Sequence, residues 1–320
     1  MVSGAINWDT SVFIENFPHA GEELKAKKVI TVPGGKGANV AVASAKILGA
    51  NQVGIIGALG DDDIGDKQIK ILHEEDVDAS CIKRIQGATS GQAYTVVESK
   101  GENFILTYKA ANNMITADMV NDDATVTAIK NSKLITVIDP PLEVADALIT
   151  KAKNFDKMVI WSPSLLVRQG FETIKELLIK ADYIILNESE SSILSGINDT
   201  KKACSTLSNK IEGNRIITTL GKEGCAFCWQ TKTATIPALN LAELGLRVIN
   251  TVGAGDAFVG TFSALIAKGF GDMEALFMAN IAGSLKTTKE ETRASMRYVE
   301  LRKYFDDKRV QSLFAKINVV

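Results

Sequence analysis

Four short apolar runs indicate the fold class of this chain: Leu134-Ile-Thr-Val-Ile138, Met158-Val-Ile-Trp161, Tyr183-Ile-Ile-Leu186 and Ile216-Ile-Thr-Thr219. Each is continuous and rich in β-branched residues, which is typical of a strand buried on both faces. The segments between them have apolar residues at helical spacing, and we expect helices over residues 143–153, 170–180 and 188–209,. Strands that alternate with helices predict an α/β fold with a mainly parallel sheet flanked by helices.

The N-terminal part follows the same alternation, with some exceptions. Strands are predicted at 2–6 and 53–56, and helices at 36–48 and 65–75,. Two β-rich segments, at about 11–31 and 92–108, do not fit the alternation. In the second, residues 93–97 and 104–108 flank Lys100-Gly101-Glu102-Asn103, which predicts an antiparallel hairpin,. We expect these two segments to form a small β lid over the core.

Length and composition limit the function classes. The chain has 320 residues with 36 basic and 38 acidic side chains, so its formal charge is −2 and it lacks the basic field of a nucleic-acid-binding protein,. The longest stretch without Asp, Glu, Lys or Arg covers residues 47–60, which is too short for a membrane span,. The sequence shows neither a linker nor a secretory signal. We therefore expect one domain over residues 1–320, a cytoplasmic location, and neither nucleic acid nor a membrane as partner.

The cysteines and histidines restrict the available chemistry. Cys225 and Cys228 lie in a strand-like run, where a spacing of three residues puts their thiols on opposite faces,. This spacing favours buried side chains over a redox or zinc pair. The chain has only two histidines, so a Ser-His-Asp relay is disfavoured and a carboxylate is the expected general base,.

The strongest local signal is Val248-Ile-Asn-Thr-Val-Gly-Ala-Gly-Asp-Ala-Phe-Val-Gly260. We interpret it as a strand that ends at Asn250, a glycine turn, and a helix that begins near Asp256. From residue 254 onward the chain is predicted to be helical. Amide groups at a glycine-led helix N-terminus can bind a phosphoryl oxygen. Asp256 is then either a general base or simply an acid that caps the helix.

Two further segments carry candidate binding residues. Val32-Pro-Gly-Gly-Lys-Gly-Ala-Asn39, a second glycine-rich turn, opens the helix predicted at 36–48, and its Lys36 and Asn39 suit a polyhydroxylated ligand,. Asn187-Glu-Ser-Glu190 directly follows a strand, the position where ligands of open α/β sheets bind, although a simple helix cap is an equal alternative,. Neither GxxxxGK[ST] nor GxGxxG occurs, which disfavours Walker-type NTPases and Rossmann dehydrogenases,.

Taken together, the motifs resemble the ribokinase (PfkB) family of carbohydrate kinases over essentially the whole chain. The segments that carry the resemblance are Gly4-Ala-Ile-Asn-Trp-Asp9, Pro33-Gly-Gly-Lys-Gly-Ala-Asn39, Gly57-Ala-Leu-Gly-Asp61 with Gly65, Asn187 with Glu190, Thr219-Leu-Gly221 with Gly224, and Thr251-Val-Gly-Ala-Gly-Asp256. The first two are most similar to the ribose kinases of the family. The resemblance implies a ribokinase-like fold with a β lid, and ATP-dependent phosphorylation of the primary hydroxyl of D-ribose to ribose 5-phosphate.

The resemblance also implies residue roles. Asp256 is the implied general base, and the anion hole is formed by Gly253, Ala254 and Gly255. The implied sugar-binding residues are Asn7, Asp9, Gly35, Lys36, Asn39, Asp139 and Asp256. The residues implied to border ATP are Asn187, Thr219, Gly221, Gly224, Gly255 and Asn280. Glu190 is implied to contact Mg²⁺ through water. A monovalent cation such as K⁺ is implied at Asn250, Val252 and Ser295. The resemblance also implies a homodimer that forms through the lid sheet.

Three departures from the family pattern leave alternatives open. Trp8 stands where a small residue is common, and Asp139 is one methylene shorter than the Glu of ribokinases. These two leave open a related kinase for a nucleoside or another sugar. Asn250 replaces an Asp, and Glu290-Glu291 replaces a glycine-containing turn, so weak or absent activation by K⁺ is expected. A sugar- or nucleotide-binding protein without catalysis is the alternative from another class.

Overall fold

A sheet with the strand order β13-β12-β11-β10-β9-β8-β1-β4-β5 forms the centre of the molecule. The computed structural model describes residues 1–320 except 100–101, 213, 316, 318 and 320. The strands are β1 (Val2–Gly4), β4 (Val53–Gly60), β5 (Val77–Ile85), β8 (Leu134–Ile138), β9 (Met158–Ser162), β10 (Tyr183–Asn187), β11 (Arg215–Thr219), β12 (Cys225–Trp229) and β13 (Lys232–Ile236). The pairings from β5 to β11 are parallel, and β12 and β13 extend the sheet antiparallel. The mainly parallel sheet predicted from the sequence is therefore confirmed.

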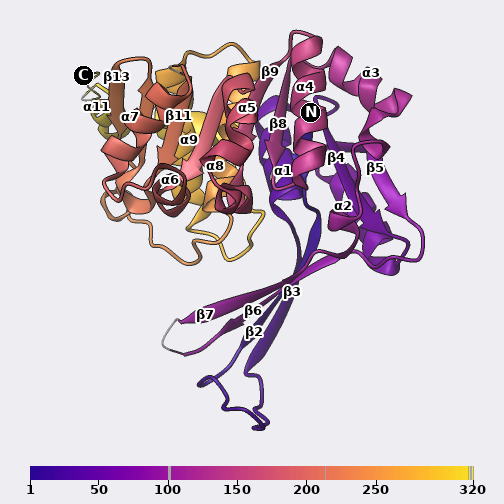
Figure 1. Ribbon diagram of the computed structural model, residues 1–320. Coiled ribbons are helices and arrows are strands. Elements are labelled where there is room, and N and C mark those ends of the chain that lie inside the picture. The colour runs from indigo at the N-terminus through magenta and orange to yellow at the C-terminus, as the bar shows by residue number, and fades with distance from the viewer. Residues whose placement is uncertain (100–101, 213, 316, 318, 320) are drawn as a thin grey trace.

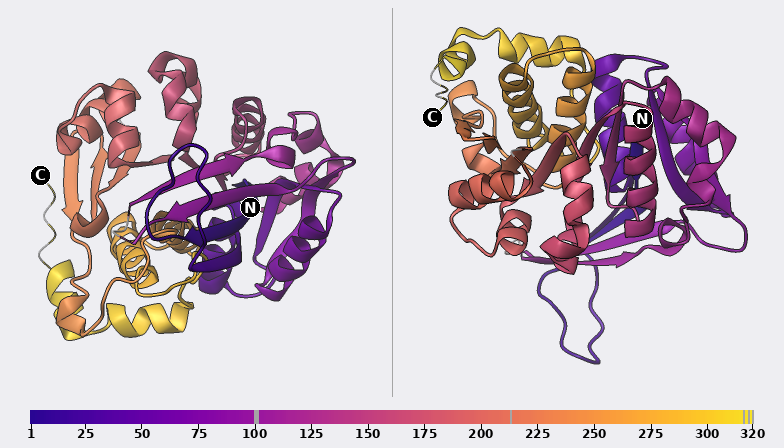
Figure 2. Two further views of the ribbon diagram at one scale, coloured as in Figure 1. Left: turned by 90° about the horizontal axis from the view of Figure 1, so that it is seen from below. Right: turned by 45° about the horizontal axis from the view of Figure 1, so that its top comes forward.

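Helices cover both faces of this sheet (Figures 1 and 2). One face is covered by α1 (Lys36–Leu48), α2 (Asp63–Glu74), α8 (Ala254–Ala267), α9 (Asp272–Lys286), α10 (Tyr298–Phe305) and α11 (Lys308–Phe314). The other is covered by α3 (Asp123–Asn131), α4 (Leu142–Asn154), α5 (Phe171–Lys180), α6 (Glu188–Ser195) and α7 (Thr200–Lys210). Among the described residues, no helix is long and apolar enough to span a bilayer.

A second, smaller sheet projects from the body of the molecule (Figure 1). It has the order β3-β2-β6-β7, with β2 (Asn7–Phe13), β3 (Lys28–Gly34), β6 (Gly91–Val97) and β7 (Asn103–Tyr108). β6 and β7 pair antiparallel, as predicted for the hairpin, although Lys100 and Gly101 of its connection lie outside the described residues. The predicted lid sheet is present, and it begins at Asn7 rather than at residue 11.

Three predicted elements differ from the structure. The helix expected over 188–209 is two helices, because Gly196 adopts the left-handed conformation after α6 and the Asp199 side chain caps α7,. The strand expected over 2–6 ends at Gly4, and the chain then enters the lid as β2. No strand ends at Asn250, because the amides of Ile249 and Asn250 both donate to the Thr287 carbonyl oxygen at the end of α9.

The cysteine prediction is confirmed. Cys225 and Cys228 both lie in β12, and their side chains pack into the cores on opposite faces of the sheet. Both cysteines are buried and free.

Close contact between α1 and α8 sets the geometry at one end of the sheet. Gly260, in the middle of α8, has no side chain to separate the two helices, and a Cβ there would lie 2.6 Å from the Ala43 Cβ and 2.6 Å from the Val40 carbonyl oxygen. The Ser44 hydroxyl donates to the Gly260 carbonyl oxygen at 3.0 Å across the same contact. The N-terminal turns of α1 and α8 are thereby held next to each other.

We expect Gly260→Ala to lower the free energy of unfolding by about 1–3 kcal/mol, because the added methyl group overpacks this contact. The sign is diagnostic, since Gly→Ala inside an unconstrained helix gains about 1 kcal/mol. Urea denaturation measures the change. Gly271→Ala, at the N-cap of α9 where a Cβ meets no atom within 4 Å, is the control without overpacking and should lower stability by less than about 1 kcal/mol, since only the cap preference of glycine is lost,. Equal stability of Gly260→Ala and the wild type would contradict the assigned contact.

Candidate active site

The two glycine-rich turns singled out in the sequence meet at the N-termini of α1 and α8. Gly35 precedes α1 and Gly253 precedes α8. The Asn39 side-chain amide, which is 4% exposed, donates to Oδ2 of Asp256 at 2.8 Å. Residues 217 positions apart in the chain are thus joined by a hydrogen bond. The structure brings the predicted sugar motif and the predicted catalytic motif into one site.

The surroundings of Asp256 favour a proton acceptor with an elevated pKa. Burial raises the pKa of its carboxyl group, while the hydrogen bond from Asn39 and the positive charge of Lys36 act in the opposite direction,. The negative charge of Asp139 raises this pKa further. A carboxylate with a raised pKa and a fixed orientation is suited to general-base chemistry.

The first turn of α8 presents backbone N–H groups next to Asp256. Gly253 adopts a positive φ of 83°, a backbone conformation that a side chain would strain,. The Ala254 amide donates to Thr251 and the Ala257 amide to Gly253, whereas the amides of Gly253, Gly255 and Asp256 have no acceptor among the described residues. Ala254 was expected to contribute to the anion hole, but its own amide is already bonded. The arrangement is suited to binding an anion at the positive end of the helix dipole.

Asp9 lies in β2 with its carboxylate against Gly34. Its Oδ1 atom is buried and has no hydrogen-bond partner in the described part of the chain. The pKa of the Asp9 carboxyl group is raised to about 6, chiefly by burial. The positive charge of Arg293 opposes this rise, and the negative charge of Asp256 adds to it. A buried oxygen without a partner is expensive, so this atom is a candidate for accepting a ligand hydroxyl.

Arg293 is the site residue that sequence reasoning missed. Its side chain is 8% exposed, and it donates to the Asn39 side-chain oxygen at 3.1 Å and to the Gly34 carbonyl oxygen at 2.8 Å. Since the Asn39 oxygen accepts from Arg293, the Asn39 nitrogen is turned toward Asp256. In the sequence, residues 290–295 suggest only a monovalent-cation site, and nothing marks this arginine as buried.

Other predicted sugar-site residues have partners within the protein. The Lys36 ammonium group donates to the Ser164 hydroxyl. The Asn7 side-chain oxygen accepts from Asn112 at 2.9 Å. Asp139, after β8, has a positive φ of 60° and lies 3.9 Å from the Lys109 ammonium group.

The residues predicted to border ATP follow neighbouring strands of the main sheet. Asn187 pairs with Thr219 at the carboxyl ends of β10 and β11. Asn187 and Glu190 form a capping box at the start of α6, with hydrogen bonds of 2.8 and 3.0 Å, so the cap considered from the sequence is present,. Gly221 and Gly224 lie in the turn between β11 and β12, at the 3₁₀ helix Gly221–Glu223.

Asn280, also predicted to border ATP, uses its amide inside the protein. It is buried in α9 and donates to the Cys225 sulfur at 3.4 Å and to the Ile236 carbonyl oxygen at 3.3 Å. Nothing among the described residues forms a cluster of three or more His, Cys, Asp or Glu side chains that could hold a metal ion.

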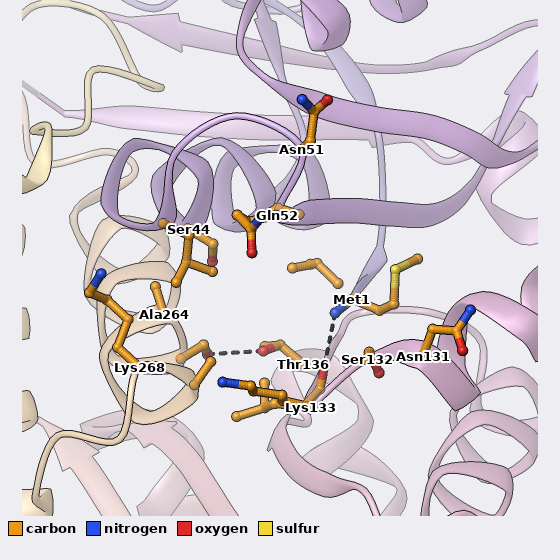
Figure 3. A pocket seen from close by; sticks show the side chains of 16 residues that line it. Met1, Ser44, Asn51, Gln52, Asn131, Ser132, Lys133, Thr136, Ala264 and Lys268 are labelled. Atoms are coloured by element: carbon orange, nitrogen blue, oxygen red, sulfur yellow. Dashed lines mark hydrogen bonds between the residues drawn. The ribbon is translucent and has the colours of Figure 1, made fainter.

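A cavity of about 410 Å³ lies elsewhere in the molecule (Figure 3). It is lined by the C-terminal ends of α1 and α8, including Leu48 and Ala267, and by Met1 and Leu134 at the starts of β1 and β8. A hydrogen bond of 2.9 Å between Thr136 and Ser263 crosses it. None of the predicted site residues lines this cavity, which lies at the opposite ends of the two helices that form the candidate site.

Comparison with known proteins bears on this site. A family model described as pfkB family carbohydrate kinase matches residues 1–298. The chain is 31% identical to the ribokinase of Bacillus subtilis over 89% of this chain and 91% of that protein. It is 28% identical to the deoxyribokinase of Salmonella typhi over 93% of this chain and 95% of that protein. The solved structure of Arabidopsis thaliana ribokinase complexed with ribose and ATP superimposes with a TM-score of 0.82 at 25% identity, covering 98% of this chain and 97% of that one.

The raised pKa of Asp9 predicts a pH-dependent stability effect. Between pH 3.8 and about 6 the folded state keeps a proton that the unfolded state releases, so this group lowers stability as the pH rises through that window,. We therefore expect Asp9→Asn to be more stable than the wild type at pH 7.5, by up to ~3 kcal/mol, and equally stable below about pH 4. Thermal unfolding across pH 4–8 measures this. Asp118→Asn, at an exposed site, is the control, and a pH-independent difference for Asp9→Asn would contradict the assignment.

Proposed function

This chain belongs to the pfkB family of carbohydrate kinases, and we propose that within this family it transfers the γ-phosphoryl group of ATP to the primary hydroxyl of D-ribose, giving ribose 5-phosphate and ADP. That it is an ATP-dependent sugar kinase follows from its family and its relatives. The observation that supports the assignment of the reacting groups is the hydrogen bond from Asn39 to Asp256 beside the free amides of α8.

Asp256 acts as the general base in this proposal. The hydroxyl oxygen of the sugar attacks the γ-phosphorus while its proton passes to the Asp256 carboxylate, and the bond from the γ-phosphorus to the leaving ADP oxygen breaks. Asn39 keeps one carboxylate oxygen occupied at 2.8 Å and thereby orients the other. Arg293 in turn holds Asn39, so it acts as a positioning residue.

The phosphoryl group is stabilised by backbone groups. The amides of Gly253, Gly255 and Asp256 point to the position where negative charge develops during transfer, and the N-terminus of α8 adds its dipole. Mg²⁺ enters as part of the Mg·ATP substrate, and we propose that Glu190 reaches it through water. The exposed apolar side chains of Val248 and Ile249, just before this turn, offer a surface for the adenine,.

The sugar is proposed to lie between the lid and the body. Oδ1 of Asp9 accepts a sugar hydroxyl, and Gly35, Lys36 and Asp139 complete the pocket. Since a relative that is 28% identical over 93% of this chain is named a deoxyribokinase, the choice of sugar depends on which hydroxyl Asp9 accepts. Deoxyribose, other sugars and nucleosides are therefore the competing acceptors.

Release of ADP from Mg·ATP with pentoses, hexoses, deoxyribose and nucleosides tests the proposal. We expect D-ribose to give the highest kcat/KM, and Asp256→Asn to lower kcat on ribose by ~10²-fold or more with little change in KM, because the base acts chiefly in the transition state. A nucleoside or deoxyribose that exceeds ribose by orders of magnitude would replace the sugar assignment.

The Asp256→Asn variant tests the role of Asp256 as general base separately from the choice of sugar. Near-normal turnover of Asp256→Asn would show that this residue only caps α8. Binding of sugar and nucleotide with no turnover of any acceptor by the wild type would favour the non-catalytic binding protein.

We further propose that the lid sheet pairs two copies of the chain. Large apolar side chains are exposed on it, at Val29, Tyr94, Phe104, Ile105, Leu106 and Tyr108. β7 is the last strand in the order of the small sheet, so it forms an edge, and every residue of it is exposed, Leu106 to 60%. An apolar edge strand of this kind is a template for pairing with another chain.

Sedimentation equilibrium tests this pairing. We expect a dimer for the wild type, and a monomer for Ile105→Lys combined with Leu106→Lys, because charges on the edge oppose pairing. Substitution of the exposed Leu165, which lies in the body of the protein, with Lys serves as the control and should leave the dimer intact. A monomeric wild type at micromolar concentration would contradict the pairing.

A further inference from the structure

Lys286, the last residue of α9, is a buried lysine that neither the proposed reaction nor the sequence motifs account for. It is 0% exposed, and its ammonium group donates to the backbone carbonyl oxygen of Asn250 at 3.1 Å. Lysine is almost never fully buried without a partner for its charge. The placement of this charge therefore calls for a role.

The ammonium group contacts a residue whose polar groups are all engaged. The Asn250 amide nitrogen donates to Thr287 at 3.0 Å, and its side-chain nitrogen donates to the Glu290 carbonyl oxygen at 2.7 Å. Its side-chain oxygen accepts from the Val252 amide at 3.0 Å. Asn250 thus ties the turn before α8 to the segment 286–290.

This turn carries the amides assigned to the phosphoryl group. Gly253 packs directly against the backbone of Thr292, so the start of α8 rests on the segment that follows α9. Lys286 holds the other end of this turn through its hydrogen bond to Asn250, and its positive charge acts to lower the pKa of the Asp256 carboxyl group. A displacement of Lys286 would therefore move the turn.

The family resemblance implies a monovalent cation at Asn250, Val252 and Ser295, and the surroundings of Asn250 do not fit one. A K⁺ site is built from several oxygens that are free to face the ion. Here the side-chain oxygen of Asn250 accepts from a backbone amide, and its carbonyl oxygen accepts from Lys286. A second cation beside the buried ammonium group would also be repelled, with little screening.

We propose that the ammonium group of Lys286 is a tethered cation that takes the place of an exchangeable monovalent ion and holds the turn 250–253 in position. Lys286 is accordingly a positioning residue. The inference rests on the proposed function only in that this turn carries the phosphoryl-binding amides. It predicts an enzyme that is indifferent to K⁺, and a variant that becomes dependent on it.

The test compares the wild type and Lys286→Ala in K⁺, Cs⁺, Na⁺ and N-methylglucamine at equal ionic strength and fixed Mg·ATP. For the wild type we expect the same Tm and the same kcat in all four. For Lys286→Ala we expect a lower Tm and kcat reduced on the order of tenfold or more in N-methylglucamine, because the turn is misplaced. In K⁺ or Cs⁺, which fit the vacated space, the kcat of Lys286→Ala should recover severalfold and its Tm should rise by several degrees.

The matched control is Lys289→Ala, which removes the same charge three positions away at an exposed site and should show none of these effects. Lys286→Met keeps the apolar stem, and it replaces Lys286→Ala if the latter does not fold. A K⁺-specific rise in Tm or kcat of the wild type overturns the proposal, as does a Lys286 variant that loses nothing or is rescued by no ion. The Tm readout needs no sugar, so failure of the ribose assignment leaves this test intact.

Discussion

The close approach of α1 and α8 at Gly260 is the contact on which the candidate site depends. Each helix supplies its N-terminus to the site, and a glycine precedes each of them, Gly35 before α1 and Gly253 before α8. Asn39 reaches Asp256 only because no side chain separates the two helices. The requirement is steric: a single methyl group at Gly260 would occupy space already filled by α1.

Charge is distributed unusually around this contact. Asp9, Asp256, Arg293 and Lys286 are all partly or fully removed from water. Asp256 accepts from the Asn39 amide, and Arg293 and Lys286 donate to backbone carbonyl oxygens, whereas Oδ1 of Asp9 has no partner among the described residues. Buried charges of this kind rarely contribute to stability, since desolvation offsets their attraction. They do fix orientations, and a phosphoryl-transfer site consists mainly of fixed orientations. Arg293 and Lys286 extend this arrangement beyond the residues that face the ligands.

The small sheet contributes Asp9 to the candidate site, most of whose other residues lie in the body of the protein. β2 leaves the end of β1 and carries Asp9 away from the main sheet, so the same chain segment links the core to the sugar pocket that we propose. The small sheet buries little of its own apolar surface, and β7 stays exposed along its whole length. A sheet of four strands with such an edge is stabilised by covering it, either with a ligand-bound body or with a second lid.

Local patterns in the sequence determined most of the fold. The β-branched runs of β8 to β11 and the helical spacing between them require a parallel sheet with helices on both faces, and the glycine turns at Gly35 and Gly253 mark the helix starts at the site,. Tertiary structure decided the rest. Val248 and Ile249 have the pattern of a strand but lie exposed, because the neighbouring amides bond to Thr287. Arg293 and Lys286 look like surface residues, and only tertiary packing buries them: Arg293 against Asn39, 254 positions away, and Lys286 against Asn250, 36 positions away. A charged side chain gives no local sign of the partner that it will find.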